Sequence, residues 1–297
     1  MTHSRLSRRG VVALAAVGLA GCTSSEDRND DGGTNGGNTD DTNGSESDAN
    51  GADERDSTDR DIEANWDEAA PFRTWLLDTD ANRRFDYTEE FPADADPASG
   101  FPDVFGVSDG AIDAHLIQTG THVFFGSFDS ESIVDGVEAA DEYDSAGQYE
   151  GYALLTQTLP DGQPQDIAIG SDVIVVGNDY ERRIDAHRGE RDRLEETDPE
   201  FTHLFRELPH ETTVSGQYGS PTGANVDIDE LHLWGVSSEF PTAETMTWVF
   251  VFEREEDLTG TALEELEGIS SGVEDSSIDG RTATVVGAPP DIPEEVP

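Results

Sequence analysis

Aromatic side chains are absent from the first 65 residues, and this confines where the chain can build a hydrophobic core. All 4 Trp, 6 Tyr and 13 Phe residues lie at or after Trp66. Residues 23–65 hold almost nothing apolar beyond Ala49, Ala52, Ile62 and Ala64. Such a segment cannot bury enough apolar surface to offset the entropy that ordering costs. We therefore expect residues 22–65 to be a disordered acidic tether, and residues 66–297 to form a single globular domain with a short Pro-rich C-terminal tail.

Acidic side chains dominate the whole chain. The sequence carries 66 Asp and Glu against 17 basic residues, all of them Arg, for a formal net charge of −49. From Trp66 onward 52 acids stand against 11 Arg, so the excess belongs to the folding part. Self-repulsion at this density opposes compaction in dilute buffer, whereas in about 1 M salt the Debye length is roughly 3 Å. The pattern resembles haloarchaeal proteins. A site for basic partners or Ca²⁺ is the alternative, but the acids are spread and not clustered. Nucleic acid is excluded as a partner, because phosphate binding needs clustered positive charge.

The N-terminal segment has the features of an export signal. Arg5, Arg8 and Arg9 precede an apolar run, Val11 to Ala20. That run is too short to span a bilayer, which needs about 20 apolar residues. A charged start, a short apolar core and small residues before a cleavage point are typical of a signal peptide, here residues 1–21. The alternatives are an apolar helix with a buried cysteine and an uncleaved anchor.

Two shorter motifs refine that prediction. The pair Arg8-Arg9 resembles the twin-arginine signal of the Tat translocase. Leu19-Ala20-Gly21-Cys22 resembles a lipobox, which implies that Cys22 becomes the lipidated first residue of the mature chain. The resemblance is to Tat-exported haloarchaeal lipoproteins, and it implies anchoring in the cell membrane on the extracytoplasmic face, with membrane lipid as the partner of Cys22.

Cys22 is the only cysteine, so the chain has no disulfide framework, no cysteine zinc site and no cysteine nucleophile apart from it. A flexible tether of residues 23–65 would span on the order of 35 Å, enough to hold a domain clear of a membrane and a cell-wall layer. Asn43-Gly44-Ser45 on this segment matches an N-glycosylation sequon.

After Trp66 the hydrophobic pattern predicts an α+β fold, mostly antiparallel sheet with helices packed on one side. Nine short runs rich in β-branched and aromatic residues predict strands at 112–118, 121–128, 149–158, 166–170, 173–177, 213–219, 231–237, 246–253 and 281–287. Three apolar stripes predict helices: Ile133, Val134, Val137 and Ala140; Phe201, Leu204, Phe205 and Leu208; Ala262, Leu263, Leu266 and Ile269. We expect Asp198 as N-cap with Pro199 at N1 of the second helix, and Thr261 with Glu264 as a capping box of the third.

The order of these elements suggests a weak internal duplication. Residues 112–158 and 231–287 both run strand, strand, helix, strand. Between them, residues 167–219 hold a tight hairpin, a helix, a second helix that begins with Asp-Pro-Glu-Phe, and a strand. This block resembles exported domains of unknown function in bacteria and archaea. It covers about a third of the chain, and the resemblance implies no catalytic residues.

Two motifs could carry chemistry. Gly106 to Gly110, GVSDG, matches the G-x-S-x-G elbow that would make Ser108 a hydrolase nucleophile. That elbow works on a turn from a strand into a helix, whereas a strand follows here, so a Gly-flanked turn is the favoured interpretation. Asp78, Asp80, Asn82, Asp86 and Glu89 have EF-hand spacing, but Arg83 stands where the loop needs Gly. Prolines also interrupt the exiting helix. A plain turn into a strand, RFDYTE, is the favoured interpretation.

The remaining candidates are histidines and a short acidic run. The histidines beyond the signal are His115, His122, His187, His203, His210 and His232, and none forms an H-E-x-x-H pair. We expect His203 to be solvated, because it lies off its apolar stripe. Asp227 to Glu230, DIDE, is expected to be a loop before a strand.

The sequence thus predicts a halophilic cell-surface lipoprotein with a non-catalytic binding or structural domain. It predicts no catalytic, cofactor or metal residues, and allows an unidentified surface ligand or protein as a partner. The alternatives are an exported hydrolase that uses Ser108 and a Ca²⁺-dependent surface module that uses Asp78 to Glu89.

Overall fold

The computed structural model describes residues 63–290, apart from 93–94, 102, 138–139, 160–161, 222–225 and 227. The predictions for Arg8 and Arg9, for Cys22, for Asn43 and for Asp227 lie outside the described residues. Within the described part of the chain, no helix is long and apolar enough to cross a membrane.

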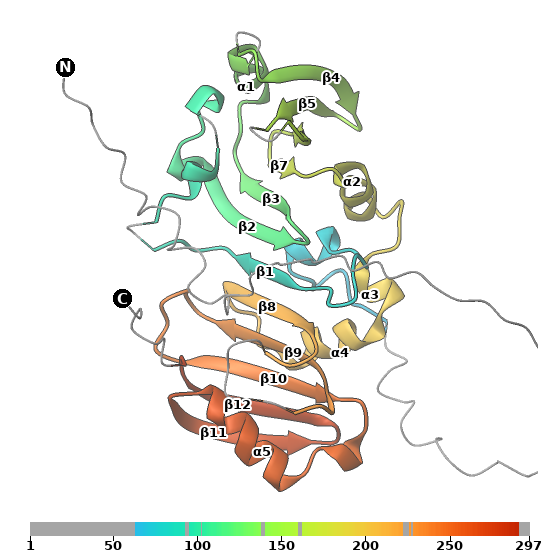
Figure 1. Cartoon of the computed structure of the whole chain (residues 1–297), viewed down its shortest axis with the longest axis vertical. Helices are drawn as coiled ribbons and strands as arrows, with labels where there is room; N and C mark the ends of the chain where they lie inside the picture. Colours follow the sequence, from blue (N-terminus) through green and yellow to red (C-terminus); the bar gives the residue numbers. More distant parts are fainter. Residues whose placement is uncertain are drawn as a thin grey trace, which may run out of the picture.

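One antiparallel sheet of 12 strands runs through the described part of the chain from one end to the other (Figure 1). Its spatial order is β11-β12-β10-β9-β8-β1-β2-β3-β7-β6-β5-β4. The bounds are β1 Phe85–Thr88, β2 Ile112–Gln118, β3 Thr121–Gly126, β4 Tyr143–Tyr149, β5 Tyr152–Thr158, β6 Pro164–Ile169, β7 Val173–Val176, β8 Thr213–Tyr218, β9 Leu231–Ser238, β10 Met246–Phe252, β11 Gly272–Asp279 and β12 Thr282–Ala288. The sheet-dominated α+β prediction is confirmed, and all nine predicted strands are present within a few residues.

Two edge strands were missed by the sequence pattern. β4 and β11 close the two ends of the sheet, and most of their side chains are exposed. Each follows a helix and pairs with the next strand of the chain, β4 with β5 and β11 with β12. Each also carries a bulge, at Ser145/Gly147 and Val273/Asp275. Bulges and charges on an edge strand disfavour pairing with another chain.

Among the residues that the structure describes, five α-helices connect the strands: α1 Ser130–Val137, α2 Tyr180–Arg188, α3 Leu194–Thr197, α4 Pro199–Glu207 and α5 Gly260–Leu266. The predicted start of α4 is confirmed, since Pro199 occupies the first turn and the Asp198 side chain accepts from the Glu200 N–H. The predicted capping box of α5 is wrong. Thr259 is the N-cap, because its backbone is extended and its hydroxyl accepts from the Ala262 N–H.

Helices cover both faces of the sheet, at different places along it. Val123 and Val175 are cross-strand partners and belong to the apolar cluster that includes α2, α3 and α4. Their strand neighbours Phe124 and Ile174 belong to the cluster that includes α1. Because successive strand residues point to opposite faces, these clusters lie on opposite sides. The prediction of helices on one side is therefore wrong.

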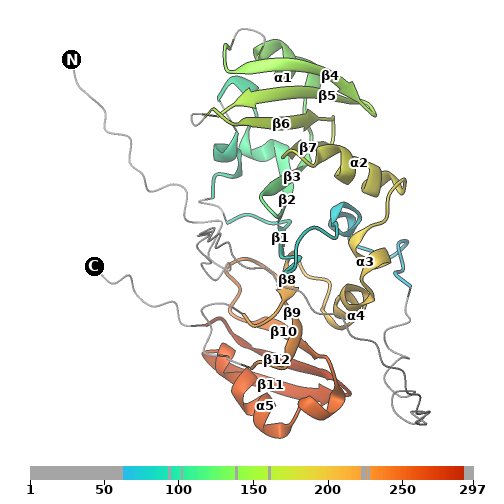
Figure 2. The same cartoon turned by 45° about the vertical axis from the view of Figure 1, so that its right-hand side comes forward.

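The same alternation places α5. Along β10, Val249 and Val251 join the cluster of α2–α4, whereas Trp248 and Phe250 join the cluster of α5. Helices α2 to α4 thus cover the middle of one face, and α1 and α5 cover the two ends of the other. Figure 2 shows α2, α3 and α4 along one side of the sheet, with α5 in front of its lower end. We call these the inner-helix face and the end-helix face.

Helix α4 packs on a patch without side chains. Gly216 on β8 and Gly235 on β9 are cross-strand partners on the inner-helix face. A Cβ added at Gly235 would lie 2.7 Å from Leu208 Cδ1, and one at Gly216 would lie 3.2 Å from Leu204 Cδ2. The paired glycines let α4 approach the sheet closely, and this approach positions the charged residues at its N-terminus.

Candidate functional site

The predicted calcium loop forms a turn into β1. Asp80 Oδ1 accepts from the backbone N–H groups of Asn82 (3.1 Å) and Arg83 (2.7 Å). Arg83 has a φ of 50°, so it adopts the left-handed conformation for which an EF-hand loop uses Gly. Asp80 is therefore used within the turn, which is the interpretation that the sequence favoured.

The other predicted calcium ligands are engaged separately. Asp78 pairs with Arg83, Asp86 accepts from Ser215 Oγ (2.8 Å), and Glu89 accepts from Tyr87 OH (2.8 Å). The described part of the chain holds no group of three or more His, Cys, Asp or Glu side chains that could bind a metal ion. The spacing of these acids in the sequence does not bring them to one point.

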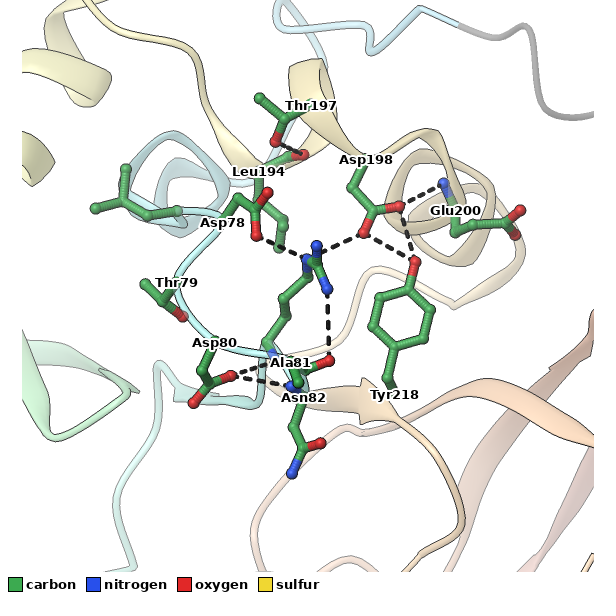
Figure 3. A network of polar contacts seen from close by, with 12 residues as sticks. Asp78, Thr79, Asp80, Ala81, Asn82, Leu194, Thr197, Asp198, Glu200 and Tyr218 are labelled. Atoms are coloured by element: carbon green, nitrogen blue, oxygen red, sulfur yellow. Dashed lines mark hydrogen bonds and ion pairs between the residues drawn. The ribbon is translucent and has the colours of Figure 1, made fainter. Parts of the chain in front are cut away.

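Arg83 is the centre of a polar network between the turn and helix α4. Its Nε lies 2.9 Å from Asp78 Oδ1 and 3.2 Å from Asp198 Oδ2. The Tyr218 hydroxyl lies 2.9 and 2.8 Å from the two oxygens of Asp198. Figure 3 shows Asp78, Asp198 and Tyr218 converging in this way. The guanidinium also lies over the Tyr218 ring, 5.2 Å from its centroid. The N-cap of α4 is thereby tied to the entry of β1 and the exit of β8.

Two further acids beside Asp198 each bind an arginine from a distant part of the chain. Arg73 makes a two-point contact with Glu195 at 2.7 and 2.5 Å, and the exposed fractions of the two side chains are 7% and 1%. Arg281 lies 2.7 Å from Glu200, with exposed fractions of 3% and 10%. We call Glu195, Asp198 and Glu200 the acidic hub.

Burial sets the electrostatics of the hub. Burial raises the pKa of Glu195, and its hydrogen bond and charge contact with Arg73 oppose that shift. Burial likewise raises the pKa of Asp198, opposed by the Tyr218 hydrogen bond and the charge of Arg83. A buried carboxylate without its partner is costly, so the three arginines are required for a charged hub to be buried.

Arg183 on α2 forms a second internal network. Its NH1 donates to the Trp75 carbonyl (3.0 Å) and to Gln118 Oε1 (2.9 Å), and its NH2 donates to the Gln118 carbonyl (3.1 Å). Its Nε donates to Asp179 Oδ2 at 3.0 Å. Gln118 in turn exchanges two 3.0 Å hydrogen bonds with the backbone of Leu77. This network joins α2 and β2 to the segment that precedes β1.

Polar side chains also occupy the middle of the end-helix face. The registers place Asp86 opposite Ser215, and Thr88 opposite both Thr213 and His115. The Thr88 and Thr213 hydroxyl oxygens lie 3.3 Å apart. We define the central polar strip as the residues that β8, β1, β2 and β3 contribute here: Asp86, Thr88, His115, His122, Thr213 and Ser215.

Two histidines at one end of this strip contact each other directly. His115 Nε2 lies 3.0 Å from His122 Nδ1, and the His115 ring stacks on Phe124 at 4.2 Å with an interplanar angle of 5°. Burial, followed by the proximity of His122, lowers the pKa of His115 to about 3. Burial also lowers the pKa of His122. Both rings are therefore neutral near pH 7.

Three of the remaining histidines have structural contacts, and the Tyr218 and His232 rings meet edge-on with centroids 4.9 Å apart. His203 Nε2 lies 2.7 Å from Thr282 Oγ1 and the side chain is buried, so the prediction that it is solvated is wrong. Thr282 is the first residue of β12, and a contact between α4 and this strand cannot be seen in a helical wheel. His187 stacks on Trp75 with ring centroids 4.4 Å apart, and His210 is exposed.

Ser108 is exposed and lies between two 3₁₀ turns, Asp103–Phe105 and Asp109–Ala111. Strand β2 follows the second turn directly. The strand-to-helix turn of a nucleophile elbow is not formed at this position, and the Gly-flanked turn is present. Of the acidic run, Asp229 and Glu230 form the turn before β9.

Sequence reasoning missed the arginine pairs of the interior. A signal for them exists, because Arg73 lies between Phe72 and Trp75 and Arg281 directly precedes the apolar strand β12. An arginine inside an apolar run indicates a buried ion pair, since charged residues are almost never fully buried unless they are paired.

No family model matches the chain, and no curated protein matches it. Two solved structures are similar in outline. Crystal form I of TP0453 has a TM-score of 0.44 and 8% sequence identity, over 74% of this chain and 93% of that one. Crystal form IV of TP0453 has a TM-score of 0.40 and 9% identity, over 73% and 92% of the two chains.

Proposed function

We propose that this chain is a lipid-anchored protein of the extracytoplasmic surface of a halophile, and that its domain serves there as a non-catalytic binding or structural module. The observation that carries the proposal is the order of features at the N-terminus. Arg8-Arg9, a short apolar run and a lipobox ending at Cys22 are followed directly by an acidic segment without aromatic residues. Export, lipid attachment and a spacer are the functions that this order serves.

The distribution of charge within the domain supports a brine environment. The arginines of the interior are each paired with an acid: Arg73 with Glu195, Arg183 with Asp179, and Arg281 with Glu200. The acids outnumber the arginines almost fivefold from Trp66 onward, so most of them have no basic partner to bind. Molar salt screens the repulsion among exposed acids, while buried pairs are screened much less.

The topology supports an internal duplication as the origin of the domain. β1, β2, β3, α1, β4 and β5 follow each other in the same order as β8, β9, β10, α5, β11 and β12. The first strands of the two sets, β1 and β8, pair antiparallel at the junction, and the sets extend from it in opposite directions. In the first set the hairpin β6–β7 is inserted between β3 and β5.

A non-catalytic role is supported by how the reactive groups are used. The polar side chains that the fold gathers bind one another across elements, as in the acidic hub and the Arg183 network. The acidic hub links the two halves of the sheet through Arg83, Tyr218 and Arg281, and the Arg183 network stabilises the first half. A domain of this kind presents a stable surface on a tether, which suits a binding or scaffold role outside the membrane.

The test is to change the lipid-attachment residue in the native host. With Cys22→Ser, the protein should move from the membrane pellet to the soluble extracellular fraction, with at least about a tenfold change in their ratio, because lipid chains supply the membrane affinity. Mass spectrometry of the wild-type mature N-terminus should show a lipid adduct on Cys22. Membrane fractionation in molar salt followed by immunoblotting measures the ratio.

Two control variants make the result specific. Asn43→Gln alters the tether outside the lipobox and should leave the protein in the pellet. Arg8→Lys with Arg9→Lys should leave an unprocessed precursor inside the cell. If the Cys22→Ser protein sediments with the envelope as firmly as the wild type, lipid anchoring is wrong. If the double arginine variant is exported normally, Tat export is wrong.

A further inference from the structure

The two histidines of the central polar strip have a geometry that a hydrogen bond alone does not require. They come from the adjacent strands β2 and β3, and the register places Phe124 opposite His115 and Ile117 opposite His122. The pair is therefore diagonal across the two strands. The rings are almost parallel, with an interplanar angle of 20°, and their facing nitrogens are 3.0 Å apart. The two facing nitrogens are thus close enough to bind one ion that lies to one side of the line between them.

The distance between the nitrogens selects a coordination geometry. Imidazole nitrogens bind first-row metal ions at about 2.0–2.1 Å. Two such nitrogens 3.0 Å apart would subtend roughly 95° at the ion. This angle matches neighbouring ligands in a square-planar or tetragonal site, and it is smaller than the tetrahedral angle of a structural zinc site.

We propose that His115 and His122 form a two-histidine site for Cu²⁺, whose remaining positions are filled by water. Among divalent first-row ions Cu²⁺ binds nitrogen ligands most tightly, and a tetragonal N,O environment is its preferred one. Both protein ligands are imidazoles, and imidazole nitrogen is the commonest side-chain ligand of transition metals in proteins.

The surroundings fit a cation. Asp86 lies in the same cross-strand row as His122, with Ile117 between them. It is the acid of the central polar strip, it pairs with Arg84 at 3.1 Å, and 33% of its side chain is open to solvent. His122 is half-buried, whereas His115 is buried, so the ion would approach from the His122 side. The strongly negative chain as a whole also attracts cations.

Binding requires no net loss of a proton from the protein. In the hydrogen-bonded pair one of the two facing nitrogens carries the hydrogen and the other accepts it. The donor ring passes that proton to its other nitrogen through solvent, and both facing nitrogens then present lone pairs to the ion. The ion becomes the common partner of both nitrogens in place of the shared hydrogen, lies to one side of the line that joins them, and involves no redox step.

The test is a titration of the full chain with CuCl₂ in molar NaCl at pH 7, followed by electron paramagnetic resonance. Cys22→Ser and His3→Asn are included in every sample, because a free thiol would reduce Cu²⁺ and a histidine at position 3 would bind Cu²⁺ together with the amino terminus. We expect one Cu²⁺ per chain with hyperfine structure from two imidazole nitrogens. Acids of the rest of the chain provide only oxygen ligands, which give no nitrogen splitting.

The decisive variant is His122→Asn, whose side chain is half-buried and is therefore expected to be tolerated. Changes in the outer shell of a metal site already cost about 10–100-fold in affinity, so loss of a ligand should weaken binding by at least about tenfold and abolish the two-nitrogen signal. The matched control is His210→Asn, an exposed histidine on the connection before β8, which should change neither. Circular dichroism establishes that each variant is folded.

Three outcomes would overturn the proposal. The first is a wild-type spectrum without two-nitrogen splitting at any Cu²⁺ concentration up to saturation. The second is unchanged Cu²⁺ affinity in folded His122→Asn. The third is an equal loss of the signal in His210→Asn, which would indicate unspecific histidine binding. Because these readouts do not depend on membrane anchoring, their failure is distinguishable from failure of the proposed function.

Discussion

Arg183 shows how a single residue can hold together segments that are far apart in the sequence. The side chain is fully buried and donates to groups of α2, of β2 and of the 3₁₀ turn Pro71–Trp75. Desolvation lowers the pKa of its guanidinium, and the charge of Asp179 opposes this. The residue stays charged because an arginine remains protonated across the accessible pH range. The free-energy cost of burying this charge is therefore offset only by the hydrogen bonds and the ion pair that the guanidinium makes with its partners.

Removal of this charge should be strongly destabilising. We expect Arg183→Met to lower the free energy of unfolding by about 3–5 kcal/mol, because it removes the ion pair with Asp179 and the hydrogen bonds that Arg183 donates to Gln118 and to the Trp75 carbonyl. Urea unfolding in molar salt measures the change. Arg182→Met is the matched control, since its exposed side chain is the neighbour of Arg183 on the same helix, and its effect should stay within about 0.5 kcal/mol. Equal stability of the two variants would contradict this role of Arg183.

Single residues also show which contacts could be predicted from the sequence and which could not. Asp198 was predicted as an N-cap, and the structure confirms it, because capping depends on residues two or three positions away. Its contacts with Arg83 and Tyr218 join positions 115 and 20 residues apart in the sequence, and no local pattern encodes them. The same holds for the contact of His115 with His122, which depends on the register of two strands.

At the scale of elements, exposure decided which strands could be predicted. β10 alternates between two buried clusters and is rich in aromatic and β-branched residues, so its signal is strong. β4 and β11 are edge strands with nearly every side chain in solvent, and their composition resembles that of loops. An edge strand is specified by the neighbour it pairs with, and this information is not in its own side chains.

The contact of α4 with the sheet gives a prediction at the same scale. Gly235→Val should lower the free energy of unfolding by about 1–3 kcal/mol, because the added methyl groups would occupy the space of Leu204 and Leu208. Thermal unfolding in molar salt measures the effect. Gly110→Val is the control, since a Cβ at Gly110 meets nothing within 4 Å. A Tm of Gly235→Val at or above that of the wild type would show that α4 does not depend on the paired glycines.

At the scale of the whole molecule, charge should govern stability. Moved from about 3 M to about 0.1 M NaCl, the domain should lose its β-sheet circular dichroism, because the Debye length grows from below 3 Å to roughly 10 Å and the exposed acids repel one another. The control is an equal concentration series of sucrose, which does not screen charge. A native spectrum retained in dilute buffer would count against adaptation to brine.

The overall architecture was predictable in part. Antiparallel sheet with helices follows from the short alternating runs and the three apolar stripes. The division of helices between two faces was not predictable, because α1 and α4 have equally clear apolar faces and nothing in either stripe says which side of a sheet it meets. That assignment comes from the connections and from the paired glycines under α4.

The acidic hub has a consequence for biosynthesis. Its arginines come from positions 73, 83 and 281, so the last of them leaves the ribosome about 80 residues after Glu200. Until then α4 carries an anion whose guanidinium partner has not yet been made. The ion pair between Glu200 and Arg281 therefore forms only after Arg281 has been made, and a chain that ended before Arg281 would lack this contact between α4 and the start of β12.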